Sequence, residues 1–238
     1  MPGAFKTEAV VLRSLRYGEA DRVLHLYSAD RGRLGAVAKG VRRVRSRMGG
    51  RLEPMARVSL VMHEGRGELC TVSSVDTVHA HPALREHRAS LERATQACDA
   101  VLRLLDSGEP NPHAYNLLCN ELALLDDRPE AATRAQALAF RAKLLLAAGF
   151  APELASCAAC GEREALGAFS PSAGGVVCAG CEAGSFPLGP EAHGFLAEAL
   201  ARPLAEAPAA GDTALGQADR ALAETLEHHA HVRLRRVA

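Results

Sequence analysis

The chain contains no tryptophan, and aromatic residues make up only 4% of its 238 residues. It also lacks an uninterrupted apolar run of about 18 residues, the length that a membrane-spanning helix needs. Its first residues, MPGAFKTEAVVLRS, lack the hydrophobic core and small-residue cleavage site of a signal peptide. These absences argue against a membrane protein or a secreted protein, and they predict a cytoplasmic location.

Sequence signatures of several enzyme classes are missing as well. There is no G-x-x-x-x-G-K-[ST] phosphate-binding loop, and Gly65 and Gly67 are not followed by a glycine three residues on. His63 and Glu64 lack the second histidine of a zinc protease helix. No isolated pair of carboxylates in an apolar setting marks a general acid and base. We therefore predict that the protein is not an enzyme.

The charges balance over the whole chain but not along it. The sequence has 28 basic and 28 acidic side chains and 48% hydrophobic residues, which is typical of a folded globular protein. Residues 1–78 contain 14 Lys and Arg against 8 Asp and Glu, whereas residues 79–238 contain 14 against 20. A basic first part and an acidic second part predict different partners for the two.

Strand patterns fill the first part of the chain, and no helical period interrupts them. The expected strands span residues 7–15, 22–28, 34–41, 58–63 and 69–78. Five short strands in so few residues favour a small barrel that removes its sheet edges by closure. We expect an OB-fold domain over residues 1–79, with an SH3-like barrel as the alternative.

From Pro82 onward the apolar period becomes helical. The expected helices span residues 84–105, 115–125, 133–148, 190–202 and 213–236. We thus predict an α+β protein. Its N-terminal barrel is followed by an α-helical domain over residues 80–238, with a cysteine-rich module inserted at about residues 154–187.

Two C-x-x-C pairs lie in that module, with 17 residues between them. The four cysteines are Cys157, Cys160, Cys178 and Cys181. This spacing is typical of a structural zinc site, because four thiolates complete a tetrahedron and leave no open position for catalysis. A redox pair is expected only once, and a disulfide framework is unusual in the cytoplasm. We predict one structural Zn²⁺, with Phe169 and Val176–Val177 in the hairpin of a zinc ribbon.

Other candidate ligands have simpler interpretations. Cys70, Cys98 and Cys119 lie on apolar faces of expected strands or helices, so we expect them in the core. His228, His229 and His231 could bind stray metal, but a solvated helix face is the favoured interpretation.

A basic segment runs from residue 31 to residue 51 without an acidic residue. Its cations are Arg31, Arg33, Lys39, Arg42, Arg43, Arg45, Arg47 and Arg51. Their mutual repulsion predicts an anionic partner, and a loop after the third strand could grip phosphates. Arg22, Lys6 and Arg13 are further candidates. A solvated face or an acidic protein partner is the alternative, and the scarcity of aromatic residues predicts weak sequence specificity.

Several motifs together resemble the RecO family of bacterial recombination mediators. They are TEAVVLR at 7–13, YGEADR at 17–22, GRLGAVAKG at 32–40, LEP at 52–54 and GFAPEL at 149–154, followed by C-x-x-C-G at 157–161. The resemblance implies an OB-fold, a helical body and a four-cysteine zinc module. It also implies binding of single- and double-stranded DNA, strand annealing, and RecA loading with RecR onto strands coated by single-stranded-DNA-binding protein.

The resemblance implies roles for particular residues. It favours the four cysteines as zinc ligands and residues 39–51 as a DNA-contacting loop. Arg22 matches a motif position, where it either contacts DNA or pairs with Glu19 or Asp21. We predict a non-enzymatic DNA repair mediator of the cytoplasm, associated with the nucleoid. A zinc-ribbon RNA-binding or transcription accessory factor is the alternative, whereas a nuclease or deaminase would need an open metal position or clustered carboxylates.

Overall fold

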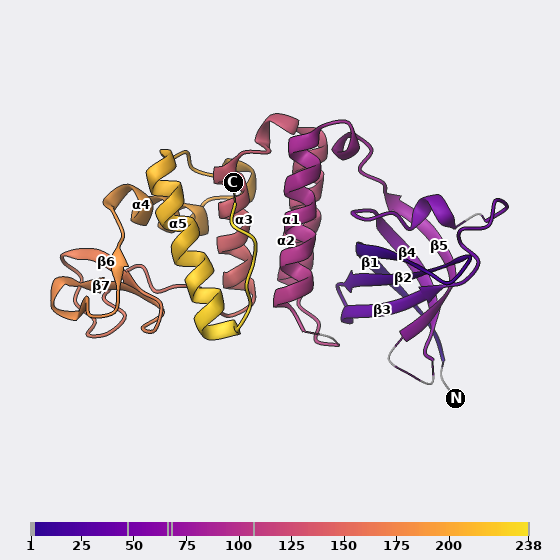
Figure 1. The fold of residues 1–238 in the computed structure, drawn as a ribbon, viewed down its shortest axis with the longest axis horizontal. Helices are drawn as coiled ribbons and strands as arrows, with labels where there is room; N and C mark the ends of the chain where they lie inside the picture. Colours follow the sequence, from indigo (N-terminus) through magenta and orange to yellow (C-terminus); the bar gives the residue numbers. More distant parts are fainter. Residues whose placement is uncertain (1–2, 47, 66, 68, 107, 238) are drawn as a thin grey trace. The chain divides into compact units, whose positions relative to one another are not determined.

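The computed structural model describes residues 3–46, 48–65, 67, 69–106 and 108–237 (Figure 1). Packing divides the chain into two compact units, Met1–Pro129 and Glu130–Ala238. No helix in the described part of the chain is both long enough and apolar enough to span a membrane.

The first unit begins with a closed five-stranded barrel. Its strands are β1 (Ala4–Tyr17), β2 (Asp21–Ser28), β3 (Gly32–Ala38), β4 (Arg57–His63) and β5 (Leu69–His79). They close in the order β1-β2-β3-β5-β4, and only the pairing of β3 with β5 is parallel. This is the topology of the OB-fold, so the OB-fold prediction is confirmed over the SH3-like alternative.

The length of β1 makes closure possible. Its first half pairs with β4 from Ala4 to Val10, and its second half pairs with β2 from Ala9 to Tyr17. A bulge between Val11 and Arg13 bends the strand between the two pairings, as bulges do in small barrels. The alternating residues that point inward form one core, which contains the fully buried Leu24, Leu26 and Leu60.

Two helices of the first unit follow the barrel. They are α1 (Arg88–Leu104) and α2 (Pro112–Asp127). Asn111 caps α2, because its side chain accepts a hydrogen bond from the Ala114 N–H at 3.0 Å. Glu8 on β1 accepts hydrogen bonds from Tyr115 of α2 at 2.9 Å and from Arg57 of β4 at 2.6 Å. Packing therefore groups both helices with the barrel, while a domain boundary after residue 79 remains a prediction.

The second unit combines three helices with a small antiparallel sheet. The helices are α3 (Arg134–Ala147), α4 (Pro190–Ala201) and α5 (Asp212–Thr225), and the strands are β6 (Leu166–Ser170), β7 (Gly175–Cys178) and β8 (Phe186–Pro187). Each of the three helices packs against the other two. Thr133 caps α3 by accepting from the Gln136 N–H at 3.1 Å, and Pro190 opens α4 at its first turn.

Single 3-10 turns complete the two units. They span Gly49–Arg51, Ala83–Arg85, Pro129–Ala131, Ala179–Cys181 and Leu204–Glu206.

The C-terminal helix is shorter than its sequence pattern suggested. A π-helical turn, Leu226–Ala230, follows α5, and His231 then adopts a left-handed backbone conformation with φ 55°. The prediction of a helix to residue 236 was therefore wrong beyond Ala230. The tail turns back along the unit, and Val237 is buried with 2% of its surface exposed.

A buried ion pair holds this tail. Arg141 on α3 and Asp219 on α5 are 5% and 1% exposed, and the Arg141 Nη1 atom lies 2.8 Å from Oδ1 of Asp219. The Nη2 atom of Arg141 donates to the Arg235 carbonyl at 2.7 Å, and Arg236 lies 3.8 Å from the other Asp219 oxygen. The pair explains why the chain leaves the helix, since a continued helix would not deliver the Arg235 carbonyl to Arg141.

Replacing Asp219 with alanine should destabilise the protein by about 3–5 kcal/mol, because the Arg141 charge would remain buried without its partner. Glu198→Ala is the matched control. It removes the exposed Glu198–Arg202 pair of α4 and should cost well under about 1 kcal/mol. Denaturant unfolding measures the loss of unfolding free energy in each variant. Similar losses would show that the buried ion pair contributes no more to stability than the exposed one.

Candidate metal centre and basic surface

The four cysteines of the C-x-x-C pairs come together in the second unit. Their sulfur atoms all lie within 4.8 Å of one another, and Cys160 Sγ lies 3.7 Å from Cys178 Sγ. Cys157 is buried, whereas Cys160 is exposed. Four sulfurs at such distances can surround one metal ion, and thiolates of this number and arrangement suit Zn²⁺.

Local backbone structure holds each pair in place. The Gly161 N–H donates to the Cys157 carbonyl at 2.8 Å, and Gly161 has a φ of 81°, a conformation that glycine adopts without steric cost. The Ala158 N–H donates to the Val176 carbonyl at 2.8 Å and so joins the first pair to β7. The second pair begins at the last residue of β7, Cys178. The hairpin expected from Phe169 and the two valines is confirmed as β6 and β7.

The sulfurs influence one another's protonation. Hydrogen bonds from the backbone N–H groups of Cys178, and then of Cys160 and Ala159, lower the pKa of Cys157 to about 6. The neighbouring sulfurs of Cys160 and Cys178 raise the pKa of Cys181 to about 12. Four crowded thiols cannot all lose their protons unless a cation compensates the charge, so metal binding here would release protons.

The sheet beside the cysteines is joined to helices of the same unit. The Phe169 and Phe186 rings lie 5.6 Å apart, and the Arg220 guanidinium of α5 sits 3.9 Å from the centre of the Phe186 ring. His193 of α4 donates from Nε2 to the Leu154 carbonyl at 2.7 Å, and His229 donates in the same way to the Pro171 carbonyl at 2.7 Å. The cysteine module is therefore a docked part of this unit.

The remaining cysteines belong to the first unit. Cys98 is 2% exposed on α1, and burial raises the pKa of its thiol to about 12. The core prediction is confirmed for Cys98, whereas Cys70 and Cys119 are only half-buried.

The basic segment of the first unit divides into two groups of cations. Four of its members are exposed in the loop after β3: Lys39, Arg42, Arg43 and Arg45. Among the residues that the structure describes, none of these four forms an ion pair with a carboxylate. Successive turns order the loop, with the Arg43 N–H donating to the Gly40 carbonyl at 3.1 Å and the Ser46 N–H donating to the Arg43 carbonyl at 2.9 Å. Arg47 lies outside the described residues.

The other predicted DNA contacts have partners within the chain. Arg22 pairs with Glu53 at 2.9 Å, Arg31 with Glu64 at 3.5 Å and Arg51 with Asp76 at 3.5 Å, while Arg33 donates to the Leu102 carbonyl at 2.6 Å. For Arg22 the partner is thus neither Glu19 nor Asp21. Arg22 and Arg33 are thus tied to the fold, whereas the ion pairs of Arg31 and Arg51 are solvent-exposed and add little stability. The contacts of all four arginines with DNA stay predictions.

One exposed aromatic side chain lies near the basic loop. Tyr17, at the end of β1, is 59% exposed, whereas Tyr27 is fully buried and Phe5 lies beneath the Arg31 guanidinium at 3.8 Å. The Arg42 N–H donates to the Ala20 carbonyl at 2.9 Å, which holds the basic loop against the β1–β2 turn that follows Tyr17. Cations and an aromatic ring therefore gather at one end of the barrel.

A second group of candidate metal ligands was missed by sequence analysis. His79, His81 and Asp126 offer ligand atoms that all lie within 4.8 Å of one another in the first unit. His79 is the last residue of β5 and His81 lies two residues after it, whereas Asp126 belongs to the last turn of α2. No short motif could reveal the group, because its third member is distant in sequence. The only local signal is the H-x-H spacing.

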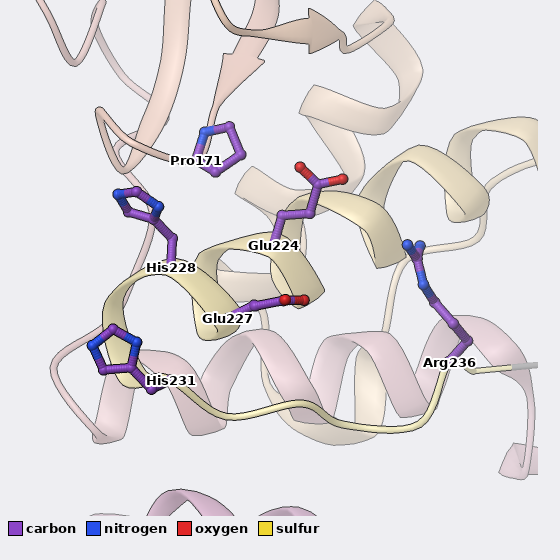
Figure 2. A pocket seen from close by; sticks show the side chains of 6 residues that line it. All are labelled: Pro171, Glu224, Glu227, His228, His231 and Arg236. Atoms are coloured by element: carbon purple, nitrogen blue, oxygen red, sulfur yellow. The ribbon is translucent and has the colours of Figure 1, made fainter.

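A polar pocket of about 600 Å³ lies at the end of α5 (Figure 2). Its lining residues are Pro171, Glu224, Glu227, His228, His231 and Arg236. Its charged side chains already have partners in the chain, since Arg220 binds Glu224, Arg233 binds Glu227 and Arg236 lies near Asp219. Figure 2 shows His231 and Arg236 at opposite ends of the tail, so these groups do not converge on one point. His228, His229 and His231 are exposed, as predicted for a solvated face.

Comparison with known proteins relates both units to one family. The family model "Recombination protein O N terminal" matches residues 1–81, and "Recombination protein O C terminal" matches residues 89–237. The DNA repair protein RecO of Rubrobacter xylanophilus is 39% identical over 209 residues, which cover 85% of this chain and 83% of that protein. RecO of Anaeromyxobacter sp. strain K is 37% identical over 244 residues, covering 96% and 92%.

These matches extend over the barrel, the helices and the cysteine module, and they agree with the OB-fold topology and the cysteine cluster. The chain belongs to the RecO family of DNA repair proteins.

Proposed function

We propose that the protein is a non-enzymatic recombination mediator that binds single- and double-stranded DNA through its barrel and basic loop. In this role it anneals complementary strands and acts with RecR to load RecA onto strands coated by single-stranded-DNA-binding protein. The observation that carries the proposal is the exposed loop on an OB-fold, where Lys39, Arg42, Arg43 and Arg45 lack carboxylate partners among the described residues. The family membership supplies the DNA repair setting.

The unpaired cations of the loop carry an electrostatic cost. Four cations within seven residues repel one another, and phosphate groups relieve that repulsion while they release condensed counterions from the nucleic acid. Guanidinium groups also bind phosphate oxygens in a bidentate manner. The geometry thus favours backbone contacts, which serve many sequences equally well.

Tyr17 gives the same surface a preference for unpaired bases. An exposed aromatic ring can stack on a base only where that base is not already stacked within a duplex, and such stacking is worth about 1–3 kcal/mol per base. Tyr17 is 59% exposed beside the turn that the basic loop contacts. Phosphate contacts from the loop serve single strands and duplex DNA alike, and the stacked base adds a preference for single strands.

We also propose that Cys157, Cys160, Cys178 and Cys181 bind one structural Zn²⁺. Their sulfurs fit a closed tetrahedral site, and a bound ion would supply a stable cross-link between the two C-x-x-C turns. Cys157 packs with Ala168 and Val177 in a small apolar cluster, so the turns have little hydrophobic core of their own. The ion would therefore replace much of the stabilisation that a larger core would provide.

Reversing the loop charges should abolish most DNA binding and spare the fold. The triple variant Arg42→Glu, Arg43→Glu, Arg45→Glu should bind single-stranded DNA at least about tenfold more weakly, and the log–log salt slope should fall by about two, at 0.7 per lost phosphate contact. Fluorescence anisotropy over a salt series measures both quantities. The matched control reverses three exposed arginines outside the barrel and gives the same change in net charge: Arg88 of α1, Arg202 just after α4, and Arg233 in the C-terminal tail.

Equal losses in the two triple variants would mean that net charge alone governs binding. Unchanged binding in the loop variant would remove the loop from the DNA interface. Parallel titrations with duplex DNA and RNA at matched salt address the alternative function, since a clear preference for RNA would favour a transcription or translation accessory factor.

Zinc should be present at one ion per chain, and Cys178→Ser should lower both the zinc content and the melting temperature, because three thiolates bind the ion less tightly than four. Cys70→Ser is the control, since Cys70 lies in the barrel and should leave the zinc content unchanged. Elemental analysis of protein prepared without chelator decides the matter. A parent protein free of zinc, with four freely titratable thiols in the module, would contradict the assignment.

A further inference from the structure

The first unit contains a group of metal-ligating side chains outside the cysteine module. We call His79, His81 and Asp126 the His–His–Asp cluster; their ligand atoms all lie within 4.8 Å of one another. His81 and Asp126 are buried, at 2% and 8% exposure, whereas His79 is exposed. The cluster is thus a polar site with a buried floor and one side open to solvent.

His81 is the member that requires explanation. Among the residues that the structure describes, neither Nδ1 nor Nε2 of its ring has a hydrogen-bond partner, although both atoms are buried. Buried polar atoms without partners are rare and costly, and here two occur on one side chain. The residue also adopts a left-handed backbone conformation with φ 48°, which costs energy for a residue with a Cβ atom. Two unfavourable features at one residue point to a missing ligand.

The neighbours of His81 are arranged as ligands and not as hydrogen-bond partners. Asp126 uses Oδ1 to accept from the Leu84 N–H at 3.0 Å, which fixes the carboxylate. Its Oδ2 atom lies 3.8 Å from the Nδ1 atom of His81, which is too far for a hydrogen bond. Two ligands of a tetrahedral zinc ion lie about 3.4 Å apart when each bond is about 2.1 Å, so a small adjustment would allow both atoms to bind one ion.

His79 completes the group from the solvent side. Its ring centre lies 4.1 Å from that of His81. Its Nδ1 atom accepts a hydrogen bond from the His81 N–H at 3.2 Å, so an ion bound at Nδ1 would take the place of this long hydrogen bond. Binding would therefore exchange one weak contact for a metal bond.

From this geometry we infer that the His–His–Asp cluster is a second metal site, which binds a divalent transition-metal ion of the zinc and cobalt class. Two imidazoles and one carboxylate are ligands that suit such ions, and the open side leaves room for water as a further ligand. Burial, then the nearby His79, lowers the pKa of His81 to about 4, so this ring is neutral at pH 7 and has a lone pair to share.

The charges around the cluster permit a cation. Asp126 and Asp127 contribute negative charge near His81, while Arg57 contributes positive charge. The Arg57 guanidinium is itself neutralised by Glu8, whose Oε1 atom lies 2.6 Å from its Nε atom. Arg85 is a further nearby cation, which donates to the Ala80 carbonyl between the two histidines at 3.2 Å. The two aspartates therefore face Arg85 as the remaining positive charge, and together they outnumber it.

The position of the cluster indicates what the ion would do. His79 is the last residue of β5, and Asp126 lies one residue before the end of α2. An ion held by both would tie the end of the barrel to α2 within the first unit. The site is therefore a clamp between the nucleic-acid-binding fold and its supporting helix, separate from the cysteine module in sequence and in ligand type.

Cobalt titration of the full-length protein tests this inference. The cysteine module is first loaded with Zn²⁺, and Co²⁺ binding is then followed by equilibrium dialysis and visible absorption. We expect one additional ion per chain, with the weak absorption of nitrogen and oxygen ligands and without thiolate-to-cobalt charge transfer. His79→Ala and Asp126→Asn should each weaken Co²⁺ binding at least about tenfold.

The variants are chosen so that folding does not obscure the result. His79 is exposed, and the asparagine at 126 keeps an oxygen that can accept from the Leu84 N–H. His113→Ala is the matched control, because His113 is an exposed histidine of the same unit outside the cluster. The inference is wrong if the parent binds no extra ion at millimolar Co²⁺. It is also wrong if His79→Ala and Asp126→Asn both bind the extra ion as tightly as the parent does. Equal weakening by His113→Ala would also overturn it.

Discussion

Closure of the barrel depends on one strand that serves two neighbours. β1 pairs with β4 along its first half and with β2 along its second half, and the bulge between Val11 and Arg13 supplies the bend. The Met55 N–H and the Ala56 carbonyl bond to the backbone of Val11 at 2.7 and 2.9 Å, so the entry to β4 is fixed at the bend itself. Because every strand then has two partners, the barrel leaves no open edge, and its loops project from a rigid base.

The barrel also determines which cations of the basic segment have carboxylate partners. Arginines on or beside the strands, such as Arg22 and Arg31, find carboxylates on neighbouring segments of the barrel. The loop after β3 contacts one carboxylate, since Asp21 Oδ1 accepts from the Gly40 N–H at 2.7 Å, but its four exposed cations form no ion pair among the described residues. The fold therefore divides this basic segment into arginines that have carboxylate partners and loop cations that have none among the described residues.

Sequence patterns were sufficient for features that depend on local periodicity or spacing. Alternation and turn residues predicted the five strands, and the two C-x-x-C pairs predicted the cysteine cluster. Features that depend on distant partners were missed. Glu53 lies 31 residues from Arg22, and the C-terminal helix ends early because Arg141, on another helix, binds a carbonyl of the tail. The approach of Asp126 to His81 is likewise set by how α2 packs, which no local pattern encodes.

The cysteine module has a particular place in the connectivity of the second unit. It leaves the helices after α3 and returns at Pro190, the start of α4, so it is an insertion between two helices that contact each other directly. The entropic cost of closing a loop grows only slowly with its length. Contact between α3 and α4 therefore does not require an ordered module. We expect the helices to pack first and the cysteine module to fold against them afterwards. Folding of this unit would then proceed in two stages, and the proposed zinc site belongs only to the second.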